Sequence, residues 1–320
     1  MRRSRSAYAL SVTTPAADDQ LVRYTDAALE RPVSPALRVA RLDVLSAIVD
    51  LRRVPDAGLT LPWAWKGGSE EEVRYGFYRI SESFELAGIE ADAQIRGAGK
   101  PRGRAADLIA PATAARWDLQ GLLMGLDEPA WDADPGGEEW TIRQTVGHII
   151  ESQRYYGVGT AWWQEQGYRA DDPNLPPVTP DAAYEGLPDE EAEAAGSPTE
   201  VRDRLDVVLD RAVERLAGLP EDRLAVGARW SGFSIDVGFR LGRWSSHIRE
   251  HTVQVEKTMV MVNRSPTEVD RLVRLILAAW GRAESTMYGA IGAEDAIGIL
   301  AKAAASARTT AAEVAGLAPA

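Results

Sequence analysis

The chain contains only three histidines, and their side-chain chemistry and spacing suggest a metal site. His247 and His251 are separated by three residues, so a helix would place both imidazoles on one face at neighbouring heights. His148 borders a stripe of apolar residues that recur at helical spacing. Neutral imidazole is a common ligand for zinc, nickel, copper or iron. A third imidazole from a facing helix would complete three protein ligands and leave a position open for water or substrate, as in catalytic sites.

An ordinary structural role for these histidines is the alternative interpretation. A histidine beside an apolar stripe can be a hydrogen-bonded core residue rather than a ligand. The face of His247 and His251 also carries Trp244 and Val255, which indicates that it points inward. Because every histidine of the chain has an inward position of this kind, the pattern favours the metal site.

Charged and aromatic residues near the histidines could supply the rest of a reaction. Glu151 and Glu250 each follow a histidine by three residues, so either could orient an imidazole or move a proton. Glu250 could instead form a surface salt bridge with a neighbouring arginine, and we assign the proton transfer to Glu151.

Two arginines and two tryptophans are further candidates around the same centre. Arg240 and Arg243 precede His247 by one to two helical turns, where a guanidinium fork could hold a substrate carboxylate or the acidic part of a thiol cofactor. Both could also be ordinary surface arginines. We assign Arg243 to catalysis, and Arg240 with Trp140 and Trp244, which flank the proposed centre, to cofactor binding.

Composition excludes several other functions. The chain of 320 residues has no cysteine, which rules out disulfides, thiolate metal ligands and a cysteine nucleophile. Its net charge of −12 argues against nucleic acid as a partner, because phosphate binding needs a basic face. No stretch approaches the ~20 apolar residues that span a bilayer. We therefore expect a cytoplasmic protein that acts on a small molecule.

The elements that must position these side chains are helices. Apolar residues recur at helical spacing in eight segments, and Ser-Pro pairs at Ser34, Ser197 and Ser265 suit the starts of three of them. The expected helices cover residues 35–53, 70–96, 107–126, 141–166, 198–217, 235–262, 266–289 and 292–315. A short extended stretch is expected within 226–236, and the acidic, proline-rich segment 170–196 should form a long exposed connection. In a four-helix bundle, such a link between the second and third helices lets them run the same way.

The pattern predicts an all-α protein with four parts. Residues 1–20 should be a disordered arm, and residues 21–104 an additional N-terminal helical unit. The glycine-rich, basic stretch Gly97–Arg104 is the best boundary. Residues 105–290 should form the metal-binding four-helix bundle, and the alanine-rich residues 291–320 a C-terminal helix or tail.

Two segments resemble a known family, the DinB-like superfamily. Glu139-Trp-Thr-Ile-Arg-Gln-Thr-Val-Gly-His148-Ile-Ile-Glu-Ser is similar to its second-helix signature, in which a tryptophan precedes a helix with one ligand histidine. Arg243-Trp-Ser-Ser-His247-Ile-Arg-Glu-His251-Thr-Val-Gln254 resembles the later helix that supplies the other two. The resemblance covers residues 107–290. It implies an up-up-down-down four-helix bundle, a metal held by His148, His247 and His251, and often a homodimer.

The resemblance also bears on the reaction. Characterised relatives include S-transferases that use mycothiol or bacillithiol, and maleylpyruvate isomerases. Three neutral imidazoles would leave the ion its full charge, so a bound thiol would be deprotonated, or a bound water brought toward a pKa of ~7. We expect zinc or nickel, and a thiol-dependent S-transferase with a low-molecular-weight thiol such as mycothiol. The alternatives are a non-catalytic metal-binding protein with a stress-related or interaction role, and a metal-dependent hydrolase.

Overall fold

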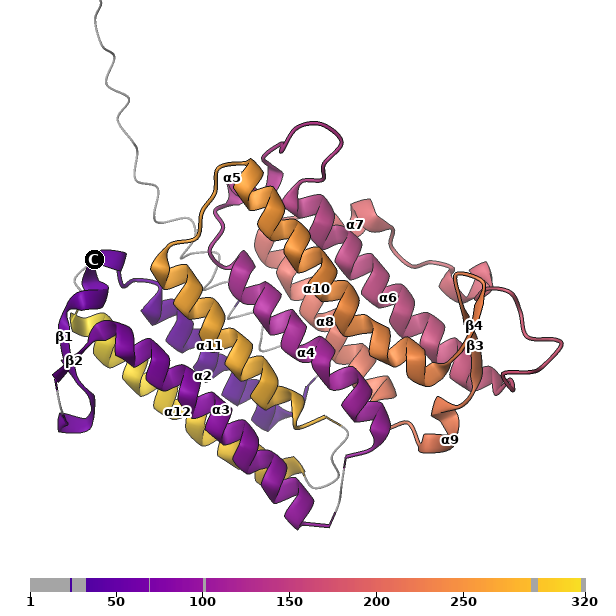
Figure 1. Cartoon of the computed structure of the whole chain (residues 1–320), viewed down its shortest axis with the longest axis horizontal. Helices are drawn as coiled ribbons and strands as arrows, with labels where there is room; N and C mark the ends of the chain where they lie inside the picture. The colour runs from indigo at the N-terminus through magenta and orange to yellow at the C-terminus, as the bar shows by residue number, and fades with distance from the viewer. Residues whose placement is uncertain (1–23, 25–32, 69, 100–101, 289–292, 318–320) are drawn as a thin grey trace, which may run out of the picture.

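Helices make up most of the structure. The computed structural model describes residue 24 and residues 33–68, 70–99, 102–288 and 293–317 (Figure 1). The long helices are α2 (Pro35–Leu51), α3 (Val73–Gly97), α4 (Arg104–Leu123), α6 (Ile142–Gln166), α8 (Pro198–Leu216), α10 (Val237–Met261), α11 (Glu268–Ser285) and α12 (Ala293–Leu317). These correspond to the eight expected segments, so the all-α prediction is confirmed. The expected arm, residues 1–20, lies outside the described residues.

Short elements connect these helices. The shorter helices are η2 (Asp56–Thr60), η3 (Trp65–Gly67), α5 (Glu128–Asp132), η4 (Asp181–Tyr184), α7 (Glu190–Ala194) and α9 (Glu221–Leu224). Two antiparallel hairpins pair β1 (Pro62–Ala64) with β2 (Glu70–Glu72), and β3 (Gly227–Trp230) with β4 (Phe233–Asp236). The second hairpin is the extended stretch expected within 226–236. No helix among the described residues is long and apolar enough to cross a membrane.

Side-chain caps fix where several helices begin. The Ser34 hydroxyl accepts a hydrogen bond from the amide of Leu37, and Ser197 forms a reciprocal capping box with Glu200. At the third Ser-Pro pair the prediction is wrong by two residues. Thr267, rather than Ser265, caps α11, because it forms the capping box with Asp270.

The long helices form two four-helix bundles. The first bundle comprises α2, α3, α11 and α12, and the second comprises α4, α6, α8 and α10, each with its own hydrophobic core. The second bundle is therefore inserted between the second and third helices of the first. Figure 1 shows the bundles side by side, with α11 against α4 at their junction.

This grouping differs from the expected division at residues 104 and 290. The apolar stripe of α11, which includes Val273, Ile276 and Trp280, lies in the core of the first bundle. The alanine-rich segment is not a free tail, because α12 packs against α2 and α3. Helical periodicity shows that a stripe is buried but not which helices bury it. The sequence therefore could not show that α11 packs in the first bundle rather than in the second.

The directions of the second bundle's helices are up, down, down, up in the order α4, α6, α8, α10 (Figure 1). Helices α4 and α8 are antiparallel, as the contacts Arg116–Asp210 and Gln120–Asp206 show. Helices α6 and α8 are parallel, as Gly157–Ala212 and Glu165–Arg215 show. Helices α6 and α10 are antiparallel, as His148–His251 and Thr160–Arg240 show. The expectation that α6 and α8 run the same way is confirmed. The up-up-down-down order is wrong, because the chain turns back at α5 and makes α6 antiparallel to α4.

The link between α6 and α8 is partly buried, contrary to the expectation of an exposed connection. Within it, α7 packs closely against α6 at Gly147. Glu193 of α7 is fully buried and forms ion pairs with Arg154 and Arg204. A buried carboxylate needs such partners, so these two arginines hold α7 in place. The consequence for the site is that α7 lies beside His148.

Candidate metal centre

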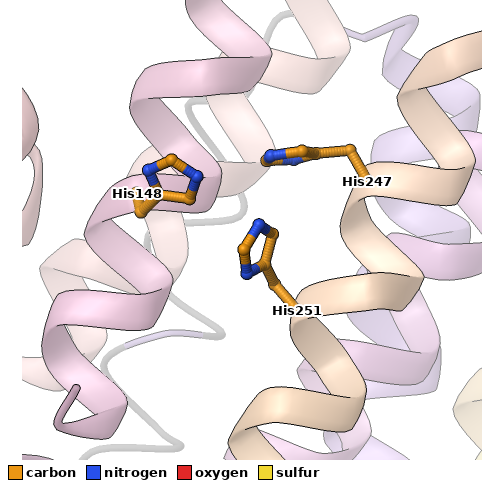
Figure 2. A group of neighbouring side chains, drawn as sticks. All are labelled: His148, His247 and His251. Carbon is orange, nitrogen blue, oxygen red and sulfur yellow. The ribbon is translucent and has the colours of Figure 1, made fainter. Parts of the chain in front are cut away.

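The three imidazoles meet between α6 and α10. His148 lies on α6, and His247 and His251 lie one turn apart on the facing side of α10 (Figure 2). The ring centroids are 5.3 Å apart for His148 and His247, 4.7 Å for His148 and His251, and 4.5 Å for His247 and His251. One nitrogen of each ring lies within 4.8 Å of the others. Three imidazole nitrogens at this spacing could bind one metal ion.

The outward nitrogens of the rings are held by neighbouring side chains. Nδ1 of His148 lies 3.1 Å from Oε2 of Glu190, and Nδ1 of His251 lies 2.8 Å from Oε1 of Gln254. Because both partners offer oxygens that accept, each Nδ1 carries the proton and donates it. Nε2 of both rings is then the unprotonated nitrogen, and it faces the shared space in Figure 2. This is the tautomer that a metal needs.

His247 is held less directly and is the most buried of the three. Its Nδ1 lies 3.4 Å from Nε2 of Gln153, whose amide also approaches the carbonyl of Trp244. Burial is the main reason that the pKa of His247 is lowered to about 3, and the adjacent rings of His251 and His148 lower it further. Burial also lowers the pKa of His251. Both imidazoles are therefore neutral at pH 7, the form that binds metal.

Two carboxylates lie behind His148. Glu151 and Glu190 form a second group with His148 whose possible ligand atoms also lie within 4.8 Å of one another. Burial, and then the nearby Glu190, raise the pKa of Glu151. Glu151 was assigned to proton transfer from the sequence, and the structure places it beside His148 and Glu190. Glu190 was missed because it lies on α7, in the link that gave no helical pattern.

The two tryptophans differ in burial and in their neighbours. The ring of Trp140 is half-buried, and its centroid is 5.1 Å from that of His148. Trp244 is fully buried in the core of the second bundle. Trp140 can therefore cover the centre, whereas Trp244, on the same helix as His247, packs into the bundle core near Gly157 of α6.

The two arginines differ in their partners. Arg243 donates to both carboxylate oxygens of Glu250, at 2.8 and 3.1 Å, so its fork is already occupied. Arg243 lines a cavity of about 660 Å³ that lies between α10, α4 and α9. Arg240 is 5% exposed and lines a different cavity, of about 270 Å³.

This smaller cavity adjoins the metal centre through one aromatic ring. Tyr156 contributes to the cavity lining, and its ring centroid is 5.3 Å from that of His247. Tyr155, Tyr184 and Trp230 also line the cavity. None of these was assigned to the site from the sequence. Tyr184 and Trp230 come from the α6–α8 link and the β3–β4 hairpin, so no helical spacing connects them to the histidines.

Comparison with known proteins supports the resemblance found in the sequence. Residues 112–255 match the DinB superfamily. The match begins within α4 and ends four residues after His251, so it spans all three imidazoles and most of the second bundle. The comparison with curated proteins and the comparison with solved structures found no match.

Proposed function

We propose that the protein is a metal-dependent S-transferase, on the basis of the match of residues 112–255 to the DinB superfamily and of the geometry of the centre. It uses a low-molecular-weight thiol and acts on a small electrophilic substrate. His148, His247 and His251 bind one divalent ion, zinc or nickel. The observation that carries the proposal is the meeting of three imidazoles, each with one nitrogen directed to the same space.

The donor set fits such an ion. His247 and His251 are neutral because burial lowers the pKa of both. The rings of His148 and His251 are fixed by oxygens behind them. When bound by three neutral imidazoles, the ion keeps its full charge and lowers the pKa of a thiol ligand, so that sulfur is presented as a thiolate.

Partial exposure of the centre supports catalysis over a purely structural site. The side chain of His148 is 24% exposed and His251 is half-buried, so a small thiol can reach the rings. Three imidazoles leave a position for that thiol, whereas a structural site is closed by four protein ligands.

The residues of the chain supply binding and proton transfer. In the proposed reaction a sulfur–carbon bond forms, a bond to the leaving group breaks, and the thiol proton must be taken up. We assign the uptake of that proton to a carboxylate oxygen of Glu151, whose pKa is raised by burial and by the nearby Glu190. The cavity beside Tyr156 accommodates the electrophile.

A thiol-conjugation assay tests the proposal. The full chain is treated with chelator, reloaded with zinc or nickel, and assayed with mycothiol or bacillithiol and an alkyl or aryl halide. We expect conjugation that requires the metal and is abolished in His251→Ala. Arg249→Gln is the matched control, because Arg249 is exposed on the same helix.

Two results would contradict the transferase. Metal binding without metal-dependent conjugation of either thiol would favour the non-catalytic protein. Metal-dependent ester hydrolysis that needs no thiol would favour the hydrolase.

A further inference from the structure

Arg240 is a buried cation without a carboxylate partner. Its side chain is 5% exposed. Nε donates to Oγ1 of Thr160 at 3.3 Å, and Nη1 donates to the carbonyl of Arg229 at 2.8 Å. Arg240 also forms a hydrogen bond with Tyr184, and its Cζ lies 5.4 Å from the ring centroid of Trp230 in a cation–π contact. Among the residues that the structure describes, no carboxylate forms an ion pair with Arg240.

Two other buried arginines have the carboxylate partners that Arg240 lacks. Arg41 and Arg116 are each fully buried, and both form ion pairs with Asp210 and Glu284. A buried charge is costly unless an opposite charge compensates it. Burial lowers the pKa of all three guanidinium groups, but at Arg41 and Arg116 the carboxylates outweigh this effect and raise the pKa, whereas at Arg240 the pKa stays lowered. An anion is therefore the complement that this position lacks.

The cavity in front of Arg240 is lined largely by aromatic side chains. The rings of Tyr155 and Tyr184 are in contact and tilted, with ring centroids 4.6 Å apart and planes 32° apart. The ring centroids of Tyr156 and Trp230 are 4.8 Å apart. The second arginine of the lining, Arg229, has a buried Nε with no hydrogen-bond partner in the described part of the chain. Aromatic walls with a few convergent polar groups are typical of a site for a small molecule.

The position of the cavity links it to the proposed reaction. The ring of Tyr156 lies between Trp230, on the cavity side, and His247, on the side of the centre. The volume of about 270 Å³ suits a molecule of roughly the size of a substituted benzene ring. A ligand anchored at Arg240 would thus lie one aromatic ring away from the imidazoles.

We propose that this cavity binds the electrophilic substrate and that the substrate is a planar aromatic or conjugated carboxylate that carries the leaving group. The carboxylate contacts the guanidinium groups of Arg240 and Arg229, and the flat body lies among the rings of Tyr155, Tyr156, Tyr184 and Trp230. This assignment of a substrate class rests on the proposed function, but the binding itself requires no metal.

Calorimetric titration of the full chain with trans-cinnamate tests this assignment, with trans-cinnamamide as the neutral analogue of the same shape. We expect saturable binding of the acid and at least about 10-fold weaker binding of the amide, because a charge-assisted contact is lost. Arg240→Gln should weaken binding of the acid by about 10-fold or more. Arg229→Gln should weaken it too, and since Arg229 is only half-buried this variant tests the cavity if Arg240→Gln fails to fold. Arg169→Gln is the control, because Arg169 is exposed and paired with Asp171.

The outcomes separate this assignment from the transferase. Equal binding of acid and amide, no binding of either, or full binding by both arginine variants would overturn the assignment, even if the thiol assay succeeds. If His251→Ala and the chelator-treated protein bind the acid as tightly as the untreated chain and still prefer it to the amide, the cavity is a carboxylate-binding site, even if no transferase activity is found.

Discussion

At the residue scale, the centre depends on the groups that hold the imidazoles as much as on the imidazoles themselves. Glu190 and Gln254 each accept a hydrogen bond from an Nδ1 and so fix which nitrogen is available. The histidines could be identified from the sequence because two share a helix face and the third lies on another strongly patterned helix. Gln254 follows His251 by three residues and was within reach of the same reasoning. Glu190 was not, since it follows His148 by 42 residues and lies on a separate short helix.

The first prediction concerns Glu190. Glu190→Gln should weaken zinc binding by about 10–100-fold, because an amide orients the His148 ring less firmly and no longer increases its basicity. The fold should be unaffected. The measurement is a competitive titration of the protein against a zinc chelator of known affinity.

Glu191→Gln is the control for this prediction, because Glu191 is the exposed neighbour on α7. Glu191→Gln should bind zinc as the unmodified chain does. Equal affinities for the two variants would show that Glu190 does not position His148.

At the scale of elements, the sequence predicted the helices and the shared direction of α6 and α8, but not that α6 is antiparallel to α4. Capping boxes and apolar stripes are properties of neighbouring residues, so the ends of α6 and α8 were expected to within one residue. The direction of α6 relative to α4 depends on where the connection turns, and no local pattern records that. The packing of α7 on α6 was likewise not predictable, although Gly147 is the residue that allows it.

The second prediction follows from this close approach. A Cβ at Gly147 would lie 2.6 Å from Cβ of Ala194 and 2.9 Å from the carbonyl oxygen of Glu190. Gly147→Ala should therefore push α7 away from α6 and lower the free energy of unfolding by about 1–3 kcal/mol. It should also weaken zinc binding, because Glu190 moves from His148. Chemical denaturation and the zinc titration measure the two effects.

Gly157→Ala, on the same helix, provides the comparison. A Cβ there would lie 3.4 Å from Cβ of Ala212, which is an ordinary contact. Alanine in a helix interior is favoured over glycine by about 0.5–1 kcal/mol, so this variant should be neutral or more stable. If Gly147→Ala is as stable and binds zinc as well as Gly157→Ala, the inferred role of Gly147 is wrong.

At the scale of the whole molecule, a buried ionic network joins the two bundles. Arg41 on α2 and Glu284 on α11 belong to the first bundle, while Arg116 on α4 and Asp210 on α8 belong to the second. All four side chains are fully buried and paired with one another across the junction. From the sequence these residues were charged positions on separate helices, and only the packing of the bundles reveals them as one cluster.

The third prediction is that the network couples the stability of the bundles. Arg41→Met should lower the free energy of unfolding by about 3–5 kcal/mol, because Asp210 and Glu284 lose a compensating charge in the core. Arg308→Met, which breaks an exposed pair with Asp43, should change it by less than about 1 kcal/mol. Urea denaturation followed by circular dichroism compares them, and equal stabilities would contradict a stabilising role of Arg41 at the junction.

The most direct test of the account is the stoichiometry of metal binding by the full chain and by its single histidine variants. Calorimetric titration with zinc and with nickel, after removal of metal by chelator, should give one ion per chain. His148→Ala, His247→Ala and His251→Ala should each weaken that binding by more than the ~100-fold upper range for an orienting residue. Retention of full affinity in any one of the three, or the absence of stoichiometric binding by the unmodified chain, would contradict a centre built from three imidazoles.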